Sequence, residues 1–310
     1  MKVVFMGTPD FAVPTLQGII DTGHEVIGVV TQPDKAKGRG KSVQFPAVKE
    51  RALQHHIPVW QPPKVRTPEF INELKDMAPE VIVVVAFGQI LPEEILTMPK
   101  YGCINVHASL LPKYRGAAPI QWAIIRGERI TGVTTMYMDT GLDTGDMILK
   151  AQINIEEEET GGSLHDKLSV LGADLLIETL KKLEDQTAIR IPQDDSQSGE
   201  YAQMLKKSMG KIDFSQSAIS IERLIRGLNP WPSAYTTLNG KTLKIWKAKV
   251  ILKHYEGSYG EIVDITKDTI IVKASDGCLA IGALQMEGKK YMETNAFLRG
   301  NNIQKGLILE

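Results

Sequence analysis

The sequence predicts an α/β domain built on a mostly parallel sheet, followed by a smaller β-barrel domain. Two observations carry this prediction. Between residues 2 and 86, short apolar strands alternate with helices, which is typical of parallel strands covered by helices. Residues 241–284 instead contain four short strands separated by Asp- and Gly-containing turns, a pattern typical of a small barrel.

The opening repeat of strand, helix and strand follows from β-branched runs bounded by turn residues. The first turn, at residues 7–9, has one glycine where a dinucleotide site needs three, which argues against a bound NAD. The expected strands are residues 2–6, 25–30, 59–60 and 81–86, and the expected helices are residues 10–21 and 69–77.

A basic loop is expected at residues 31–46. It carries Lys35, Lys37, Arg39 and Lys41 around two glycines, so it cannot bury itself and should be mobile. Two interpretations remain open, a solvated loop or a clamp for a phosphate-rich acceptor.

The central segment concentrates polar groups. A strand at residues 103–107 would present Asn105 and His107 on one side, because side chains alternate along a strand. Asp143 lies in a glycine-containing loop, residues 139–146, between strands expected at 131–138 and 147–155. Helices are expected at 117–126 and 161–183. The turn that begins at Phe87 ends a buried strand, where ligands bind in open α/β sheets.

If Asn105, His107 and Asp143 converge, they suit acyl transfer to a nucleophile that the substrate brings. The Asn amide can hold an oxyanion, His can move a proton near neutral pH, and Asp can fix the state of that His. A third close metal ligand is missing, so we expect no metal. The alternative stays open, because a lone buried His or strand Asn is more often a satisfied core group than a catalyst.

The C-terminal third is basic although the net charge of the 310 residues is −1. Residues 1–205 carry 20 basic and 27 acidic side chains, and residues 206–310 carry 16 and 10. This asymmetry favours a polyanionic partner, which an OB-like barrel would suit, although a barrel that only packs on its neighbour explains the strands equally well. The expected domains are residues 1–188 and 207–310, joined by a polar linker at 189–206.

The two cysteines, Cys103 and Cys278, lie far apart in apolar surroundings, so we expect buried, reduced thiols. The N-terminal apolar run is too short for a signal peptide, and the run at residues 81–87 has the length of a strand rather than of a membrane span. We expect a cytoplasmic protein without membrane contact.

The segment NVHASLLPKYRG followed by GLDTGD resembles the signature of the folate-dependent formyltransferase and hydrolase family. GTPDFAVPTL, TQPDKAKGRGK, GAAPIQWAI, KIDFSQSA and IRGLNPWPSAYT extend the resemblance over the whole chain, to the branch of the family that acts on tRNA. It implies a Rossmann-like domain that binds 10-formyltetrahydrofolate as formyl donor and an OB-like domain that helps to hold initiator methionyl-tRNA, whose free α-amino group receives the formyl group for translation initiation.

The resemblance also implies residue roles. Asn105 would donate to the developing oxyanion, His107 would assist, and Asp143 would keep His107 correctly charged and help to protonate the folate nitrogen as it leaves. The implied folate-binding residues are Phe87, Gly88, Leu91, Ser109, Leu110, Leu111, Pro112 and Asp139. The implied tRNA-binding residues are Arg39, Lys41, Lys206, Lys207 and Lys211. A monomer is expected, since one long substrate must reach both domains.

Three rival functions remain. Another member of the family would pass the formyl group to water or to a small amine, such as glycinamide ribonucleotide or a sugar nucleotide. A non-catalytic RNA-binding protein would use the barrel alone. A dehydrogenase is disfavoured by the missing glycines.

Overall fold

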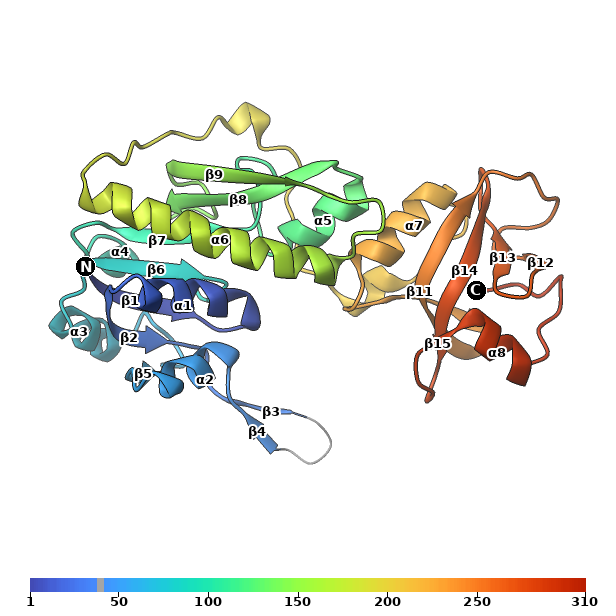
Figure 1. Ribbon diagram of the computed structural model, residues 1–310, viewed down its shortest axis with the longest axis horizontal. Helices are drawn as coiled ribbons and strands as arrows, with labels where there is room; N and C mark the ends of the chain where they lie inside the picture. Colours follow the sequence, from blue (N-terminus) through green and yellow to red (C-terminus); the bar gives the residue numbers. More distant parts are fainter. Residues whose placement is uncertain (38–41) are drawn as a thin grey trace. The chain divides into compact units, whose positions relative to one another are not determined.

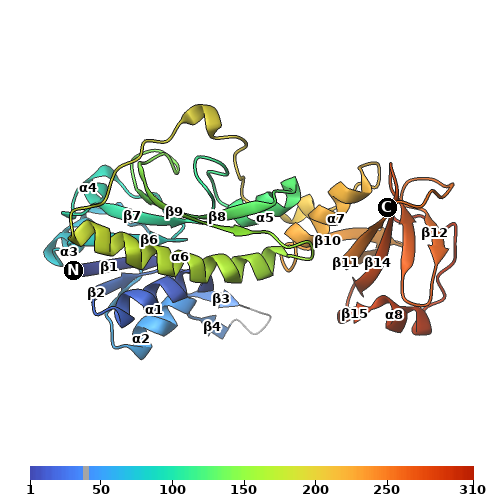
Figure 2. The same cartoon turned by 45° about the horizontal axis from the view of Figure 1, so that its top comes forward.

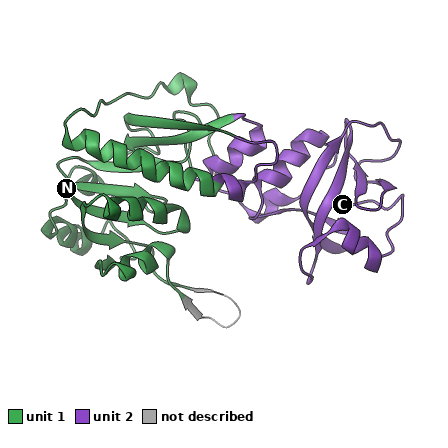
Figure 3. Ribbon diagram, in the orientation of Figure 1, with its two compact units in different colours: residues 1–116, 130–154, 165–202 green, residues 117–129, 155–164, 203–310 purple. Residues whose placement is uncertain are grey.

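The computed structural model describes residues 1–37 and 42–310. Two compact units make up these residues (Figure 3), and they interleave along the sequence. The first contains residues 1–116, 130–154 and 165–202, and the second contains residues 117–129, 155–164 and 203–310. Among the helices of the described residues, none combines the length and the hydropathy needed to cross a membrane.

The first unit is built on a seven-stranded sheet with the order β5-β2-β1-β6-β7-β8-β9. The first five strands in this order, β5, β2, β1, β6 and β7, run parallel to one another, whereas β8 and β9 pair in antiparallel fashion. The predicted mostly parallel sheet is therefore confirmed. The strands are β1 (Lys2–Gly7), β2 (Glu25–Val30), β5 (Val59–Trp60), β6 (Val81–Val85), β7 (Cys103–His107), β8 (Ile130–Tyr137) and β9 (Met147–Asn154). All five residues of β6 are buried, as expected of a central parallel strand.

Helices cover both faces of this sheet (Figures 1 and 2). On one face α6 contacts the strands so closely that a methyl group on Gly172 would lie 2.9 Å from Val106 Cγ1. On the other face α3 and α4 share an apolar cluster with β1, β6 and Cys103 of β7. The helices are η1 (Asp10–Ala12), α1 (Val13–Asp21), α2 (Ala47–Gln54), α3 (Pro68–Asp76), α4 (Glu93–Leu96), α6 (Gly161–Glu184, of which residues 165–184 belong to this unit) and η2 (Asp195–Gln197).

The basic segment differs from the predicted mobile loop in the part that is described. β3 (Lys35–Lys37) and β4 (Ser42–Gln44) pair as a short antiparallel ribbon. Arg39 and Lys41 lie outside the described residues.

The predicted C-terminal β domain is confirmed in the second unit. Its sheet is antiparallel, with the strand order β10-β11-β14-β13-β12 and β15 beside β14. Ile225, Leu243, Ile281 and Phe297 belong to its apolar core. Its elements are α5 (Pro119–Arg126), η3 (Lys207–Gly210), α7 (Ala218–Gly227), β10 (Ala234–Leu238), β11 (Lys241–Ile251), β12 (Ile262–Ile265), β13 (Ile270–Lys273), β14 (Cys278–Met286), β15 (Met292–Glu293) and α8 (Thr294–Gly300).

Residues 307–310 join the two edges of this second sheet. On the β12 side, the Ile262 amide donates to the carbonyl of Leu307 and the Leu309 amide donates to the carbonyl of Gly260, both at 2.8 Å. On the β10 side, Thr237 and Glu310 exchange two backbone hydrogen bonds of 2.8 and 3.1 Å. An edge strand with unpaired amides invites association with other chains, so this tail satisfies both edges.

Candidate active site

Asn105 and His107 project from the same face of β7, because they are two residues apart in one strand. Asn105 lies in register with Val84 of β6 and Met136 of β8, and His107 lies opposite Thr134. Pairing on both sides fixes the backbone of β7. Val106 points to the opposite face, toward α6.

The Asn105 side chain is partly exposed and has no hydrogen-bond partner among residues 1–37 and 42–310. An unpaired amide costs little where water reaches it, but it leaves two N–H donors available to a ligand. Within the described residues, Asn105 therefore differs from a core asparagine whose hydrogen bonds are satisfied by the protein.

His107 is buried, with 6% of its surface exposed, and both ring nitrogens face oxygen atoms. Nε2 lies 3.0 Å from the backbone carbonyl oxygen of Tyr114. A carbonyl can only accept, so we assign the Nε2 proton to this contact. Nδ1 then faces Asp143, whose Oδ1 is 3.7 Å away.

Asp143 is held in a left-handed conformation, with φ of +55°. Its Oδ2 accepts a 2.9 Å hydrogen bond from the amide of Gly116. The same loop is organised by Asp139, whose carboxylate accepts from the Gly141 amide at 3.0 Å and from the Thr144 hydroxyl at 2.8 Å. The structure therefore brings His107 and Asp143 together, and Asn105 lies two residues before His107 on the same face of β7.

The segment Ser109–Pro112, predicted to bind folate, folds into the core. Ser109 is 1% exposed, and its hydroxyl donates to the Lys113 carbonyl at 2.7 Å. Thr134 ties the segment to β8, because its hydroxyl donates to the Ser109 carbonyl and accepts from the Leu111 amide. The Leu111 and Pro112 side chains are also buried, whereas Leu110 is partly exposed. A ligand here would meet Leu110 and backbone atoms.

Lys150 of β9 also contacts this segment. Its ammonium group donates to the carbonyl oxygen of Leu111 at 2.5 Å, and burial lowers the pKa of Lys150. The contact fixes the Leu111 carbonyl and removes it from the surface that a ligand could reach.

The turn after β6 likewise has a buried part and an exposed part. Phe87 and Leu91 are core residues, 2% and 3% exposed, and the Phe87 carbonyl accepts from Thr8 and Gln32. Gly88 is exposed with φ of +82°. Ile90, which the sequence analysis did not select, is 80% exposed. Gly88 and Ile90 are thus among the parts of this turn that a ligand can touch.

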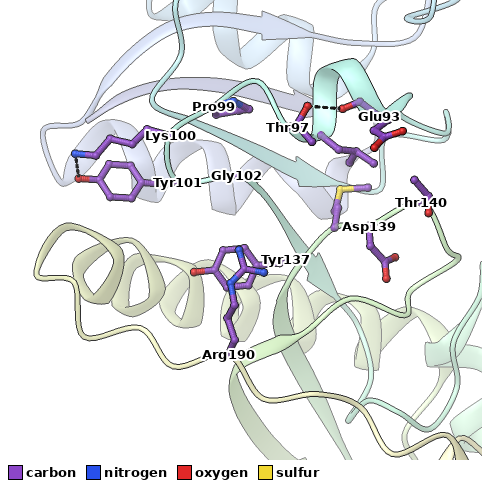
Figure 4. A pocket seen from close by; sticks show the side chains of 12 residues that line it. Glu93, Thr97, Pro99, Lys100, Tyr101, Gly102, Tyr137, Asp139, Thr140 and Arg190 are labelled. Atoms are coloured by element: carbon purple, nitrogen blue, oxygen red, sulfur yellow. Dashed lines mark hydrogen bonds between the residues drawn. The ribbon is translucent and has the colours of Figure 1, made fainter.

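A cleft of about 580 Å³ lies beside the amino end of β7 (Figure 4). Lys100, Tyr137, Asp139 and Arg190 line it, and the Arg190 guanidinium lies 3.6 Å from the centre of the Tyr137 ring. Asn105 and His107 do not line this cleft, which meets the predicted site only at Asp139. The polar cluster is the better candidate for the active site, because Asn105 and His107 belong to it and do not line the cleft.

The predicted tRNA-binding lysines lie in the second unit. Lys206, Lys207 and Lys211 are exposed, and none has an ion-pair partner in the part of the chain that the structure describes. They are therefore available to a polyanion.

Among the described residues, three groups that hydrogen-bond to His107 or Asp143 were not predicted from the sequence. They are the Tyr114 carbonyl, the Gly116 amide and the side chain of Gln193, which donates to the backbone of the Asp143 loop. The first two belong to the motif PKYRG, whereas no motif or spacing in the sequence marks Gln193 as part of the site.

Both cysteines are free and buried, as predicted. Burial raises the pKa of Cys103 to about 12, so its thiol stays protonated and unreactive at neutral pH. Within residues 1–37 and 42–310, no three His, Cys, Asp or Glu side chains are placed to hold a metal ion.

Comparison with known proteins agrees with both units. Residues 1–180 match the family described as "Formyl transferase", and residues 204–302 match "Formyl transferase, C-terminal domain". The chain is 57% identical over 309 residues to the methionyl-tRNA formyltransferase of Clostridioides difficile (strain 630), covering 100% of both chains. It is 56% identical over 306 residues to the same enzyme of Agathobacter rectalis, covering 99% of this chain and 98% of the relative.

A solved structure shares the fold at lower identity. The N-formyltransferase of Helicobacter canadensis, in complex with folinic acid and dTDP-3-aminofucose, superposes with a TM-score of 0.68 at 22% identity, covering 91% of this chain and 98% of that one. Since the family matches span both units and the curated relatives align from end to end, the chain belongs to the formyl transferase family.

Proposed function

We propose that this protein transfers the formyl group of 10-formyltetrahydrofolate to the free α-amino group of initiator methionyl-tRNA, giving N-formylmethionyl-tRNA for translation initiation. The observation that carries the proposal is the Asn105 amide, which has no partner among the residues that the structure describes. It lies two residues from a His107 that faces Asp143, in a chain 57% identical over its whole length to a methionyl-tRNA formyltransferase.

The reaction needs no nucleophile from the protein. A free α-amino group titrates at about 7.7–8.0, and esterification of the neighbouring carboxyl should lower that value, so neutral amine is available near neutral pH. Its nitrogen attacks the formyl carbon, the carbonyl oxygen becomes an oxyanion, and the bond to the folate nitrogen then breaks. The amine loses one proton and the folate nitrogen gains one.

Asn105 would stabilise the oxyanion with its free amide. Donors that are already in place when charge develops need no reorganisation, and losing one typically costs about 10²–10³-fold in turnover. The exposed edge of Asn105 and the absence of a competing partner in the described residues support this role.

His107 and Asp143 would handle the proton. The Nε2 proton is committed to the Tyr114 carbonyl, so Nδ1, which faces Asp143 at 3.7 Å, is the nitrogen left for the transfer. A proton on Nδ1 makes the ring cationic, and the carboxylate stabilises that cation.

For the donor we keep the predicted folate site and specify its surface. The pterin would lie against Gly88, Leu110 and the Asp139 loop. The other predicted residues have buried side chains that hold the backbone of the site in place, namely Phe87, Leu91, Ser109, Leu111 and Pro112. Buried side chains cannot touch the cofactor, so their replacement should affect folding before binding.

For the acceptor we propose that Lys206, Lys207 and Lys211 contact the tRNA backbone, with Arg39 and Lys41 of the basic segment at the acceptor end. The exposure of the three lysines supports the first part. Arg39 and Lys41 lie outside the described residues, and their role is taken from the family resemblance alone.

The test is transfer of labelled formyl from 10-formyltetrahydrofolate to methionyl-tRNA, with initiator and elongator tRNA and an amino-sugar nucleotide as separate acceptors. We expect product with initiator methionyl-tRNA and a loss of about 10²–10³-fold in turnover for Asn105→Ala. Asn154→Ala, an exposed asparagine at the end of β9, is the matched control and should retain activity. Transfer only to the sugar nucleotide, or full activity of Asn105→Ala, would overturn the proposal.

A further inference from the structure

The polar segment after α6 is anchored to the first unit over residues 190–195. Ile191 and Met147 exchange two backbone hydrogen bonds of 2.9 Å. The Arg190 guanidinium stacks on Tyr137 (Figure 4), and Asp195 pairs with Arg115 at 2.8 Å. A segment that only linked two domains would need none of these contacts.

Gln193 occupies the middle of this anchored segment, and its side chain turns inward. It is half-buried, whereas the residues on either side of it are exposed. Its Nε2 donates to the backbone carbonyls of Asp143 and Gly145, both at 2.8 Å. Its Oε1 accepts from Arg115 Nε at 3.0 Å and from Arg115 Nη2 at 2.8 Å.

These four contacts fix the amide in one orientation. A flipped amide would place its NH₂ group against two guanidinium N–H donors and its oxygen against two carbonyl oxygens. Gln193 therefore acts as a bridge between Arg115 and the Asp143 loop.

The Gln193 bridge connects the backbone segments that contact His107 and Asp143, the two residues proposed to move the proton. Arg115 lies between Tyr114, whose carbonyl accepts from His107, and Gly116, whose amide donates to Asp143. At the other end, Gln193 holds the carbonyls on both sides of Thr144, next to the left-handed conformation of Asp143. Both halves of the site are thus tied to one side-chain amide.

We propose that Gln193 is a positioning residue for formyl transfer, acting through Asp143. The inference rests on the proposed function. Without the two N–H donors, the Asp143 loop loses its tie to Arg115, and the 2.9 Å hydrogen bond from the Gly116 amide must then hold the Asp143 carboxylate near His107 Nδ1 without that support. Small misplacements of catalytic groups cost about 10²-fold in rate, so a loss of about 10–100-fold is expected here.

The experiment compares three variants with the unaltered protein in the methionyl-tRNA assay. Gln193→Ala removes the bridge, and Gln193→Glu keeps its shape and its contact with Arg115 but cannot donate to two carbonyls. Both should lower kcat by about 10–100-fold, with KM for folate and tRNA within about threefold. Gln197→Ala is the matched control and should be fully active, because within the described residues the Gln197 side chain hydrogen-bonds to exposed Asp194 and not to the Asp143 loop.

A double-mutant cycle separates positioning from general damage. If Gln193 acts through Asp143, adding Gln193→Ala to Asp143→Asn should cost less than about threefold further. Equal activity of Gln193→Ala and the unaltered protein, a fully additive double mutant, or a kcat loss matched by a loss of folded protein in thermal melting would each overturn the inference. An unaltered protein that transfers no formyl group would refute the proposed function instead.

Discussion

Replacing Asp143 by Asn should lower the turnover number by roughly 10²-fold with little change in the fold, because it removes a charge and almost nothing else. Asn tolerates the left-handed φ of +55° that Asp143 adopts. Its oxygen can keep the 2.9 Å hydrogen bond from the Gly116 amide, which turns its NH₂ group toward His107. The carboxylate that would stabilise a protonated ring is then gone.

The magnitude follows from the separation of 3.7 Å between Nδ1 and Oδ1. Two opposite unit charges at that distance attract by about 4.5 kcal/mol at an effective dielectric constant of about 20 and by about 1 kcal/mol in bulk water. His107 is buried and Asp143 is only partly exposed, so a value of about 3 kcal/mol is reasonable, and each 1.36 kcal/mol is about tenfold in rate.

The assay is steady-state formyl transfer to methionyl-tRNA at saturating folate, with thermal melting as the measure of folding. Asp146→Asn is the matched control. It makes the same change three residues away, where the partly exposed carboxylate pairs with Arg190 at 3.5 Å, and it should stay within about threefold. If Asp143→Asn stays within the same threefold, the charge of Asp143 has no part in the chemistry.

Three further outcomes are expected. Burial lowers the pKa of His24, so His24 is protonated in the unfolded state at a higher pH than in the folded state, and folding stability falls as the pH falls through 6.5. Melting curves recorded between about pH 7 and pH 5 should show a weaker dependence of stability on pH for His24→Gln than for the unaltered protein. Cys103, with a pKa of about 12, should react with a thiol reagent near pH 8 only after unfolding, and prompt labelling of the native protein would contradict its burial. Lys206→Ala and Lys207→Ala should each flatten the slope of log affinity for tRNA against log salt by roughly 0.7–0.9, and an unchanged slope would remove that lysine from the interface.

The sequence was sufficient where a local rule fixes the geometry. Strand alternation alone places Asn105 and His107 on one face, and β-branched runs identify the parallel strands. The family motif linked Asp143 to His107, which lies 36 residues earlier in the chain. The structure adds the distance of 3.7 Å between them.

Local rules failed where the partner is a backbone group or lies far along the chain. The Tyr114 carbonyl accepts from His107, but every residue has a carbonyl, so no sequence pattern marks it. Gln193 reaches Asp143 across 50 residues from a stretch whose composition is that of a linker. The four-residue α4 is too short to show a helical period, and β10 follows a proline-rich turn that hides its start.

The position of Asn105 and His107 on one strand has an evolutionary consequence. Their spacing is set by the covalent chain and by pairing with β6 and β8, not by any loop. Loops around them can lengthen, shorten or change sequence without altering the distance between the oxyanion donor and the imidazole. Under the proposed mechanism, descendants of such a chain can therefore acquire new acceptors while they inherit the reaction unchanged. One residue inserted between Asn105 and His107 would turn one of the two side chains toward α6, and we expect formyl transfer to be lost.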